Sequence, residues 1–324
     1  MALPALALVP EADVQVVRGL APLAGMLRRT GRVLPLARGR AGFVRGVRDV
    51  RRGGYARGVL LPPSLGSALV FALGGVRARR GTATDGRRVL LTDAVAREAT
   101  AGLHRVDAYC LLVGGRVPGR TPAPRLTPGG AAYAEWAATG APRAGAGPLV
   151  GVFPGSNAPS RRWDADRFAA VARGLADRGA AVVVFGGPDE RALTREVAGD
   201  WAYDAGGRTS LAALAAGLAE CRVLVSNDSG PQHVAAAVGT PVVALWGAGD
   251  PRVTAPVGAE HQLLRHPELP CVPCVKNVCP RAGRGYVLDD ARNECIRLTT
   301  PADVVRAVEG VLGRAGRLFW ADDA

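Results

Sequence analysis

The segment VLVSNDSGPQHVAAAV, residues 223–238, decides the fold class. It begins with a short apolar run, which is typical of a buried strand. A polar Asn-Asp-Ser-Gly loop follows, and Pro231 then stands where the first turn of a helix favours proline. Strand, loop and helix in this order predict a βα unit, the building block of a parallel sheet.

The rest of the second half repeats this alternation. Apolar runs predict strands at Leu149–Phe153, Ala180–Phe185, Trp201–Asp204, Val223–Ser226 and Val242–Trp246. Helical spacing of apolar residues predicts helices at Ala165–Arg178, Arg191–Ala198, Ser210–Leu218 and Pro231–Val238. Strands and helices of these lengths predict an α/β fold whose parallel sheet is flanked by helices on both faces. Such sheets bind their ligands at the carboxyl ends of the strands.

The first half shows the same rhythm less clearly. We expect strands at Val14–Val17, Gly58–Leu61 and Val89–Leu91, and helices at Ala41–Val50, Ser64–Leu73 and Leu103–Leu112. A Pro- and Gly-rich stretch between residues 114 and 147 indicates a linker around one short helix. We therefore predict two domains, residues 1–143 and 144–324, with a helix near the end of the second.

Positive charge is concentrated in the first half of the 324 residues. Up to residue 143 there are 22 Arg against 8 Asp and Glu, and the remainder holds 19 Lys and Arg against 20 acids, for a total of +13. A basic half favours an anionic partner, namely nucleic acid, an acidic membrane surface or a phosphorylated substrate. A solvated arginine-rich surface is the alternative.

No stretch is apolar over the length that a membrane-spanning helix needs. Met1–Pro10 is apolar, but no basic segment precedes it and acidic residues follow at once. We therefore expect no secretory signal and a cytoplasmic protein.

The loop after residue 226 has the chemistry of an anion site. Free N–H groups at the start of the following helix attract negative charge. We expect Asp228 and Ser229 to cap this helix, Gly230 to let a ligand approach the backbone, and His233 to face the same opening. The alternative is a plain capped helix with a packed histidine.

Two further loops lie at the same sheet edge. Ser156 and Asn157 follow a strand, and Arg161 stands just before the next helix, so glycine flexibility and guanidinium groups suit a diphosphate. In the third loop, Gly187 precedes Glu190, which could accept a hydrogen bond from a ribose or base. Three such loops on one edge predict a nucleotide site.

These motifs together resemble glycosyltransferase family 9, the ADP-heptose:lipopolysaccharide heptosyltransferases, and in particular its heptosyltransferase II-like members. The resemblance rests on FPGS at 153–156, RRW at 161–163, FGGP at 185–188, NDSGPQH at 227–233 and GTPVVALWG at 239–247, with LPPSLGS at 61–67 as a landmark of the first half. It implies a GT-B fold of two Rossmann-like domains, the first binding the acceptor and the second the nucleotide sugar. It further implies an ADP-heptose donor, a lipopolysaccharide-core acceptor on lipid A, and inversion at the anomeric carbon without a catalytic metal.

The resemblance also implies roles for individual residues. Ser156, Asn157 and Arg161 would hold the diphosphate, with Arg161 where the family usually has Lys. The heptose and phosphates would lie against Asp228, Ser229, Gly230 and His233. The enzyme would act at the inner face of the cytoplasmic membrane, in peripheral contact with its anionic surface and without binding nucleic acid.

The chain departs from the family pattern at its start. The family opens with a strand and a Gly-Asp loop whose Asp is the proposed general base, and the sequence MALPAL at 1–6 resembles the segment directly after that loop. We therefore expect the first strand and the catalytic loop to be missing and carry over no catalytic residue; Asp13 belongs to a later strand. A non-catalytic remnant that still binds ADP-sugar is the alternative function. A smaller departure is Ala248-Gly249-Asp250, where a Thr is usual before the Asp.

Four cysteines form a second cluster, Cys271, Cys274, Cys279 and Cys295. Disulfides are rare in the cytoplasm, and a Cys-x-x-Cys pair with two further thiols is a candidate for structural zinc. Packed reduced thiols are the alternative. Cys110 and Cys221 lie in apolar segments and are expected in the core.

Two other classes of protein lack support. A Rossmann oxidoreductase needs Gly-x-Gly-x-x-Gly after a strand, and no predicted strand here is followed by it. A nucleic-acid-binding protein would use the basic half, but aromatic residues are only 5% of the chain and no reader motif occurs.

Overall fold

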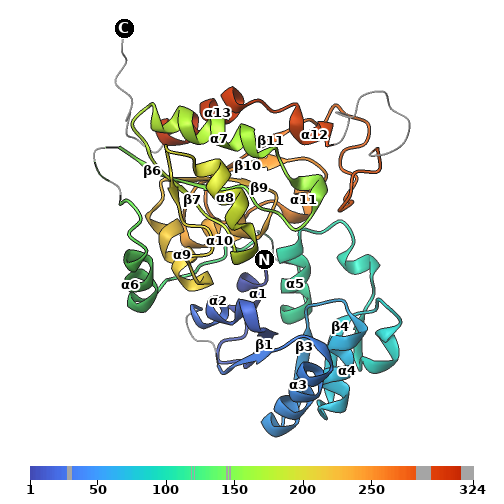
Figure 1. The fold of residues 1–324 in the computed structure, drawn as a ribbon. Helices are drawn as coiled ribbons and strands as arrows, with labels where there is room; N and C mark the ends of the chain where they lie inside the picture. Colours follow the sequence, from blue (N-terminus) through green and yellow to red (C-terminus); the bar gives the residue numbers. More distant parts are fainter. Residues whose placement is uncertain are drawn as a thin grey trace. The chain divides into compact units, whose positions relative to one another are not determined.

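A computed structural model describes residues 1–27, 31–117, 119, 121–143, 145, 147–281 and 293–314. The chain divides into two compact units, Met1–Arg125 and Leu126–Ala324 (Figure 1). Each is an α/β unit with parallel strands, which confirms the fold class expected from the sequence.

The second unit is built on a six-stranded sheet. Its strands are β6 (Leu149–Phe153), β7 (Ala181–Val184), β8 (Tyr203–Asp204), β9 (Val223–Asn227), β10 (Val242–Trp246) and β11 (His261–Arg265). They pair in the order β11-β10-β9-β6-β7-β8, and every pair is parallel. β6, β9 and β10 are buried at every residue, as expected for strands that are covered on both faces.

Helices cover both faces of this sheet. They are α6 (Gly130–Ala138), α7 (Ala165–Ala176), α8 (Arg191–Ala198), α9 (Leu211–Glu220), α10 (Gly230–Val238), α11 (Pro251–Thr254), α12 (Glu294–Arg297) and α13 (Pro301–Arg314). Two short 3₁₀ helices, η4 (Pro159–Arg161) and η5 (Pro188–Glu190), follow β6 and β7.

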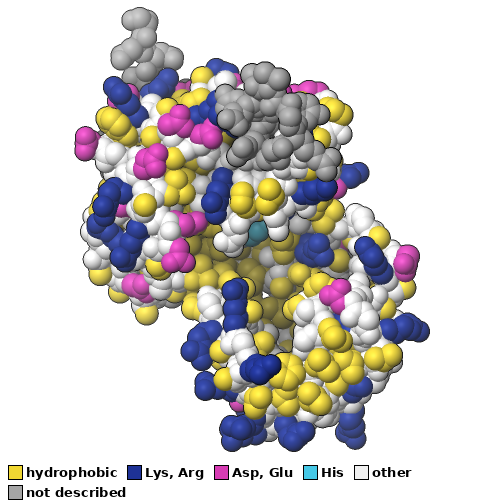
Figure 2. Space-filling view, turned by 45° about the vertical axis from the view of Figure 1, so that its right-hand side comes forward, with side chains coloured by type: hydrophobic (Ala, Val, Ile, Leu, Met, Phe, Trp, Pro, Cys, Tyr) yellow, Lys and Arg dark blue, Asp and Glu magenta, His cyan; other side chains and the backbone are white. Residues whose placement is uncertain are grey.

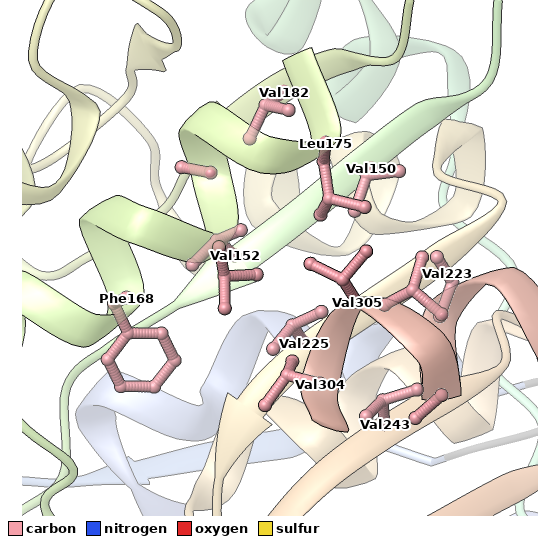
Figure 3. Packing of buried hydrophobic residues seen from close by; sticks show 14 of the residues in the cluster. Val150, Val152, Phe168, Leu175, Val182, Val223, Val225, Val243, Val304 and Val305 are labelled. Carbon is pink, nitrogen blue, oxygen red and sulfur yellow. The ribbon is translucent and has the colours of Figure 1, made fainter. Parts of the chain in front are cut away.

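One face packs against α7 and α13. Val150 and Val152 of β6 and Val223 and Val225 of β9 share a core cluster with residues of these helices (Figure 3). Fully burying such a side chain contributes about 1.5–3 kcal/mol. The alternate residues of the same strands turn to the opposite face, where a Cβ at Gly151 would contact Phe185, Leu224 and Cys221.

The opposite face is covered in part by α6, and this moves the division between the units. Trp136 of α6 is buried, lies 5.5 Å from Phe185 between ring centroids, and donates from Nε1 to Glu220. The backbone N–H of Leu126 donates to the carbonyl of Ala237. The second unit therefore begins at Leu126, 18 residues before the boundary at 143/144 that the linker composition indicated; Ala144 itself lies outside the described residues.

The first unit contains two smaller parallel sheets. One pairs β1 (Val14–Val17) with β2 (Val33–Leu36), and the other has the order β3 (Arg57–Leu60), β4 (Ala78–Thr82), β5 (Asp93–Val95). The helices are α1 (Leu3–Leu6), α2 (Ala21–Gly25), α3 (Gly39–Gly53), α4 (Leu65–Leu73) and α5 (Arg105–Gly114), with 3₁₀ turns η1 (Arg18–Leu20), η2 (Arg87–Leu90) and η3 (Glu98–Thr100).

The strand predicted at Val89–Leu91 is wrong. The first two of these residues lie in η2, and Val89 is 87% exposed. The chain turns here because Gly86 adopts a left-handed conformation and the side chain of Arg87 is fully buried, with its Nε donating to the carbonyl of Thr82. The neighbouring strand β4, with sequence ARRGT, was not predicted because its arginines hide the apolar alternation.

No helix in the described part of the chain is both long and apolar enough to cross a bilayer.

Candidate functional site

The candidate site lies where the second unit's sheet changes direction. From β6 the chain proceeds to β7 and β8 on one side, and it then returns to β9 on the other side of β6. The loops after β6 and β9 therefore lie at the carboxyl edge where the strand order reverses, which is the usual ligand position in such sheets.

Arg161 and Asp228 meet at this point. Arg161 comes from η4 after β6, and Asp228 directly follows β9. The guanidinium Nη1 lies 3.1 Å from Asp228 Oδ2, with the Arg161 side chain 23% exposed and the Asp228 side chain 3% exposed. Burial raises the pKa of Asp228, whereas the positive charge of Arg161 and a hydrogen bond from Gln232 lower it. The ion pair with Arg161 therefore favours the charged form of the Asp228 carboxylate, which has little access to solvent.

Four buried polar atoms around this pair have no hydrogen-bond partner among the described residues. They are Arg161 Nε, Asp228 Oδ2, Ser229 Oγ and Gln232 Oε1. Asp228 Oδ2 has a charge partner in Arg161, but the angle does not make a hydrogen bond. An unsatisfied buried polar group costs about 1–3 kcal/mol, so a cluster of four indicates a place where a polar ligand supplies the missing partners.

The start of α10 is open rather than capped. Ser229 is its N-cap residue, but its side chain makes no cap hydrogen bond, and Asp228 instead accepts from Gln232 Nε2 (3.0 Å) and faces Arg161. The capping expected for Asp228 and Ser229 is therefore wrong. A Cβ at Gly230 would meet no atom within 4 Å, so the helix start has room beside its backbone. The helix dipole and this space favour an anion.

Asn227 ties the loops together and was not singled out from the sequence. It is fully buried; its Nδ2 donates to the carbonyl of Pro154 (2.6 Å), and its Oδ1 accepts from the N–H of Trp163 (3.2 Å). These bonds fix both ends of the loop that carries Arg161 relative to β9. Its place immediately before Asp228 in the Asn-Asp-Ser-Gly motif was the signal that could have identified it.

Two more neighbours of Asp228 escaped the sequence analysis as site residues. Gln232, fully buried, holds one carboxylate oxygen from the first turn of α10. Gly249 packs against the other, because a Cβ there would collide with Asp228 Oδ2. The indole of Trp246 donates to the Gly249 carbonyl (2.9 Å), which holds this close approach in place.

The remaining predicted residues lie along the same edge. Glu190 Oε2 accepts from the N–H of Gly187 (2.8 Å), and its carboxylate lies so close to Gly155 that a Cβ there would collide with it. Glu190 thus joins the loops after β6 and β7 and is already engaged within the protein. Ser156 is buried with its Oγ accepting from the N–H of Ala158 (3.3 Å), whereas Asn157 is exposed.

His233 is partly buried one residue beyond Gln232, in the first turn of α10. This is the turn in which the sequence places it. Its predicted contact with the ligand stays a prediction.

The four clustered cysteines line one pocket, together with Ser160, Ala248, Pro280, Arg281 and Asn293. All six cysteines of the chain are free thiols, and Cys110 and Cys221 are buried, as expected. Burial, followed by the charges of the three neighbouring cysteines, raises the pKa of Cys295 to about 11. Yet no three His, Cys, Asp or Glu side chains within the described ranges have the geometry to hold a metal ion. The pocket has the donor set of a zinc site without its coordination geometry.

The segment that carries the cysteines is hydrogen-bonded to two loops of the candidate site. The N–H of Ser160 donates to the carbonyl of Asn277 (3.0 Å), and the Ser160 hydroxyl donates to that of Lys276 (2.5 Å). The N–H of Val275 donates to the carbonyl of Ala248 (2.8 Å). Ser160 precedes Arg161, and Ala248 precedes Gly249. The segment is therefore bonded next to two residues that contact Asp228.

Comparison with known proteins identifies the family of this chain. The model of glycosyltransferase family 9 (heptosyltransferase) matches residues 44–283. Lipopolysaccharide heptosyltransferase 2 of Escherichia coli strain K12 is 28% identical over 273 residues, which cover 78% of each chain.

Solved structures agree on the fold. E. coli ADP-heptose lipopolysaccharide heptosyltransferase II has a TM-score of 0.79 at 23% identity, covering 98% of this chain and 95% of its own. An E. coli heptosyltransferase solved with ADP has a TM-score of 0.70 at 18% identity, covering 96% of this chain and 95% of its own. With the family model spanning most of the sequence and both units, the chain belongs to glycosyltransferase family 9, the heptosyltransferase family.

Proposed function

We propose that the protein transfers heptose from ADP-heptose to the inner core of lipopolysaccharide, with inversion at the anomeric carbon. The observation that carries the proposal is the group of unsatisfied polar atoms around Arg161 and Asp228, at the open start of α10. A nucleotide sugar brings phosphate oxygens and hydroxyl groups, which supply both kinds of missing partner.

Each side chain then has a distinct task. Arg161 Nε and the start of α10 bind the diphosphate and stabilise the negative charge that develops on ADP as it leaves. Asp228 Oδ2 and Ser229 Oγ bind hydroxyl groups of the heptose. Asn227 and Gln232 keep these groups in position, since they bond to the loop and to the carboxylate rather than face the ligand.

The transfer is a direct displacement. The acceptor oxygen forms a bond to the anomeric carbon as the bond from that carbon to the ADP oxygen breaks, and a general base removes the acceptor proton. The protein would bind and orient both substrates without a catalytic metal. We assign no residue of this chain to the general base.

The donor assignment is tested by calorimetry with ADP. Replacing Arg161 with Ala should weaken ADP binding by about 1.5–3 kcal/mol, the range for a hydrogen bond to a charged group. Arg195→Ala is the matched control, because Arg195 is an exposed arginine of α8. ADP affinity that is the same in Arg161→Ala, Arg195→Ala and the parent protein would exclude this site.

The reaction is tested by ADP release in the presence of a heptose-deficient lipopolysaccharide core. We expect release that depends on the acceptor and a product whose anomeric configuration is opposite to that of the donor. Retained configuration would contradict direct displacement.

We further propose that the enzyme works in peripheral contact with the anionic inner face of the cytoplasmic membrane. The acceptor that the family relationship suggests is anchored on lipid A, and the excess of arginine in the first half suits its phosphates and an acidic surface.

For the cysteine pocket we propose a structural role, with zinc as the ion that Cys271, Cys274, Cys279 and Cys295 would bind once their side chains move into coordinating positions, which they do not occupy in this structure. Thiolates are favoured zinc ligands, and the hydrogen bonds of this segment to Ser160 and Ala248 connect it to the donor loops. Metal analysis of protein purified under reducing conditions should find about one zinc per chain. A metal-free protein of full stability, with four titratable thiols in this segment, would show that the cysteines are packed reduced thiols. Stoichiometric iron would show that the bound ion is iron rather than zinc.

A further inference from the structure

Helix α3 separates its residues sharply by face. The inner face carries Gly42, Gly46 and Val50, all buried. A Cβ at Gly46 would lie 2.5 Å from a Leu36 methyl, so the helix packs tightly against β2. Val50 joins Val70 of α4 in a small core cluster. One side of α3 is thus fixed against the first unit.

The outer face is almost entirely arginine. With a rotation of 100° per residue, its arginine side chains fall within an arc of about 140° around the helix axis. It consists of Arg40, Arg45, Arg48, Arg51 and Arg52, all exposed, which we call the α3 arginine face. Val44, 54% exposed, lies among them. Asp49, the one acidic residue of the helix, stands at the margin of this arc and is partly buried.

Other arginines of the first unit are used within the fold. Arg32 pairs with Asp13, and Arg80 pairs with Asp93. Arg87 is fully buried and bonded to backbone and side-chain oxygens. These contacts explain part of the basic composition as structure.

The α3 arginine face makes almost no such contacts. Within the described part of the chain, its five guanidinium groups form no ion pair, and only Arg51 has a hydrogen bond, to the carbonyl of Leu73. Five like charges on about 22 Å of helix repel one another, so an anionic partner would relieve an unfavourable concentration of charge.

We propose that the α3 arginine face docks the protein onto an anionic phospholipid surface. Guanidinium groups form bidentate hydrogen bonds with lipid phosphates. The exposed Val44 would contact the acyl chains just below the headgroups. Leu73 of α4, 50% exposed, carries the carbonyl that Arg51 binds and adds apolar surface next to the face. Figure 2 shows dark blue arginine and lysine side chains scattered among yellow hydrophobic and white side chains on one face of the protein.

This proposal rests on the proposed function only for its biological purpose, the approach to a lipid-anchored acceptor. Its physical basis is charge complementarity. One arginine near an acidic membrane contributes a factor of about five in affinity. Salt screens this attraction, with a screening length of about 8 Å at physiological ionic strength.

The test is vesicle co-sedimentation of the full chain. Vesicles contain phosphatidylcholine alone or with about one third phosphatidylglycerol, at low and at high salt. The test variant combines Arg40→Gln, Arg45→Gln, Arg48→Gln and Arg52→Gln, since Gln retains helix propensity. The matched control removes the same charge elsewhere in the first unit, with Arg88→Gln, Arg97→Gln, Arg105→Gln and Arg116→Gln, all at exposed positions.

We expect the parent protein to bind the anionic vesicles at low salt, and to lose binding at high salt or on neutral vesicles. The α3 variant should bind at least about tenfold more weakly, and the control less than about threefold more weakly. The proposal would be overturned if both variants lost the same amount of vesicle affinity. It would also be overturned if the parent protein bound neutral and anionic vesicles equally well. Tighter binding of the parent to duplex DNA than to the anionic vesicles at the same salt would overturn it as well.

Two measurements keep this test separate from the proposed function. Circular dichroism of both variants should show unchanged helix content and melting. ADP affinity should also be unchanged in both, because the donor residues lie in the second unit. Failure of the parent to bind ADP would reject the donor site and leave the vesicle result standing.

Discussion

Asp228 combines burial with charge. Burial raises the pKa of its carboxyl group, and Arg161 and Gln232 act in the opposite direction. If the ionised form binds the donor, affinity is highest above this raised pKa and falls as the pH drops through it. The surrounding residues therefore set the pH range in which the site works.

Gln232 provides the residue-scale test of this arrangement. Replacing it with Leu removes the hydrogen bond to Asp228 Oδ1, which favours the charged carboxylate, so the pKa of Asp228 should rise further. The acid limb of ADP-heptose binding should then move to higher pH, with little change at alkaline pH. Calorimetric titrations across the pH range measure this shift.

Asp228→Asn is the control for this titration. It has no carboxyl group to protonate, so Gln232→Leu should produce no pH shift in the Asp228→Asn background. An acid limb that stays in place when Gln232 alone is changed would show that Gln232 only fills space.

At the scale of single elements, η2 shows how one side chain organises several segments. Arg87 Nη1 donates to the carbonyl of Pro62 (2.5 Å) and to the Ser67 hydroxyl (3.2 Å), and Nη2 donates to the Thr82 hydroxyl (3.0 Å). One guanidinium thereby joins η2, the end of β4 and the start of α4. Burial lowers the pKa of Arg87, yet an arginine remains charged at neutral pH.

We therefore expect Arg87→Met to destabilise the first unit by about 3 kcal/mol, because it leaves several buried acceptors unsatisfied. Arg88→Met is the matched control, since Arg88 is the next residue and is exposed. Its free energy of unfolding should stay within about 0.5 kcal/mol of the parent. Urea unfolding followed by circular dichroism compares the two, and equal stability would show that the Arg87 hydrogen bonds contribute no net stability.

The strands and helices of the second unit show where local pattern predicts well. The strands at Leu149–Phe153 and Val242–Trp246 and the helix at Arg191–Ala198 occur with the predicted bounds. Both strands are buried at every residue, and the helix buries Val197 and Ala198, so burial and periodicity agree. In the first unit, β2, β4 and β5 were not predicted, because β2 contains a proline, β4 contains two arginines and β5 has only three residues, so none shows that periodicity.

At the scale of the whole molecule, the two units differ in character. The second has a complete six-stranded sheet and a large apolar core, and the predicted donor residues all belong to it. The first has smaller sheets, and part of its positive charge is held in internal contacts, while the α3 arginine face forms no ion pair within the described residues. The charge asymmetry of the sequence therefore has two sources, one structural and one available to a partner.

The sequence by itself determined the alternation of strands and helices, the loops at the carboxyl edge and the family, because element type depends on local spacing and the motifs are contiguous. Tertiary structure decided which polar groups are satisfied. The bond from Asn227 to Pro154 spans 73 residues and that from Trp136 to Glu220 spans 84, and no local pattern encodes either. For the same reason the engagement of Glu190 by Gly187 and Gly155, the missing cap of α10 and the division at residue 125 emerged only from the fold, where distant side chains compete for the same partners.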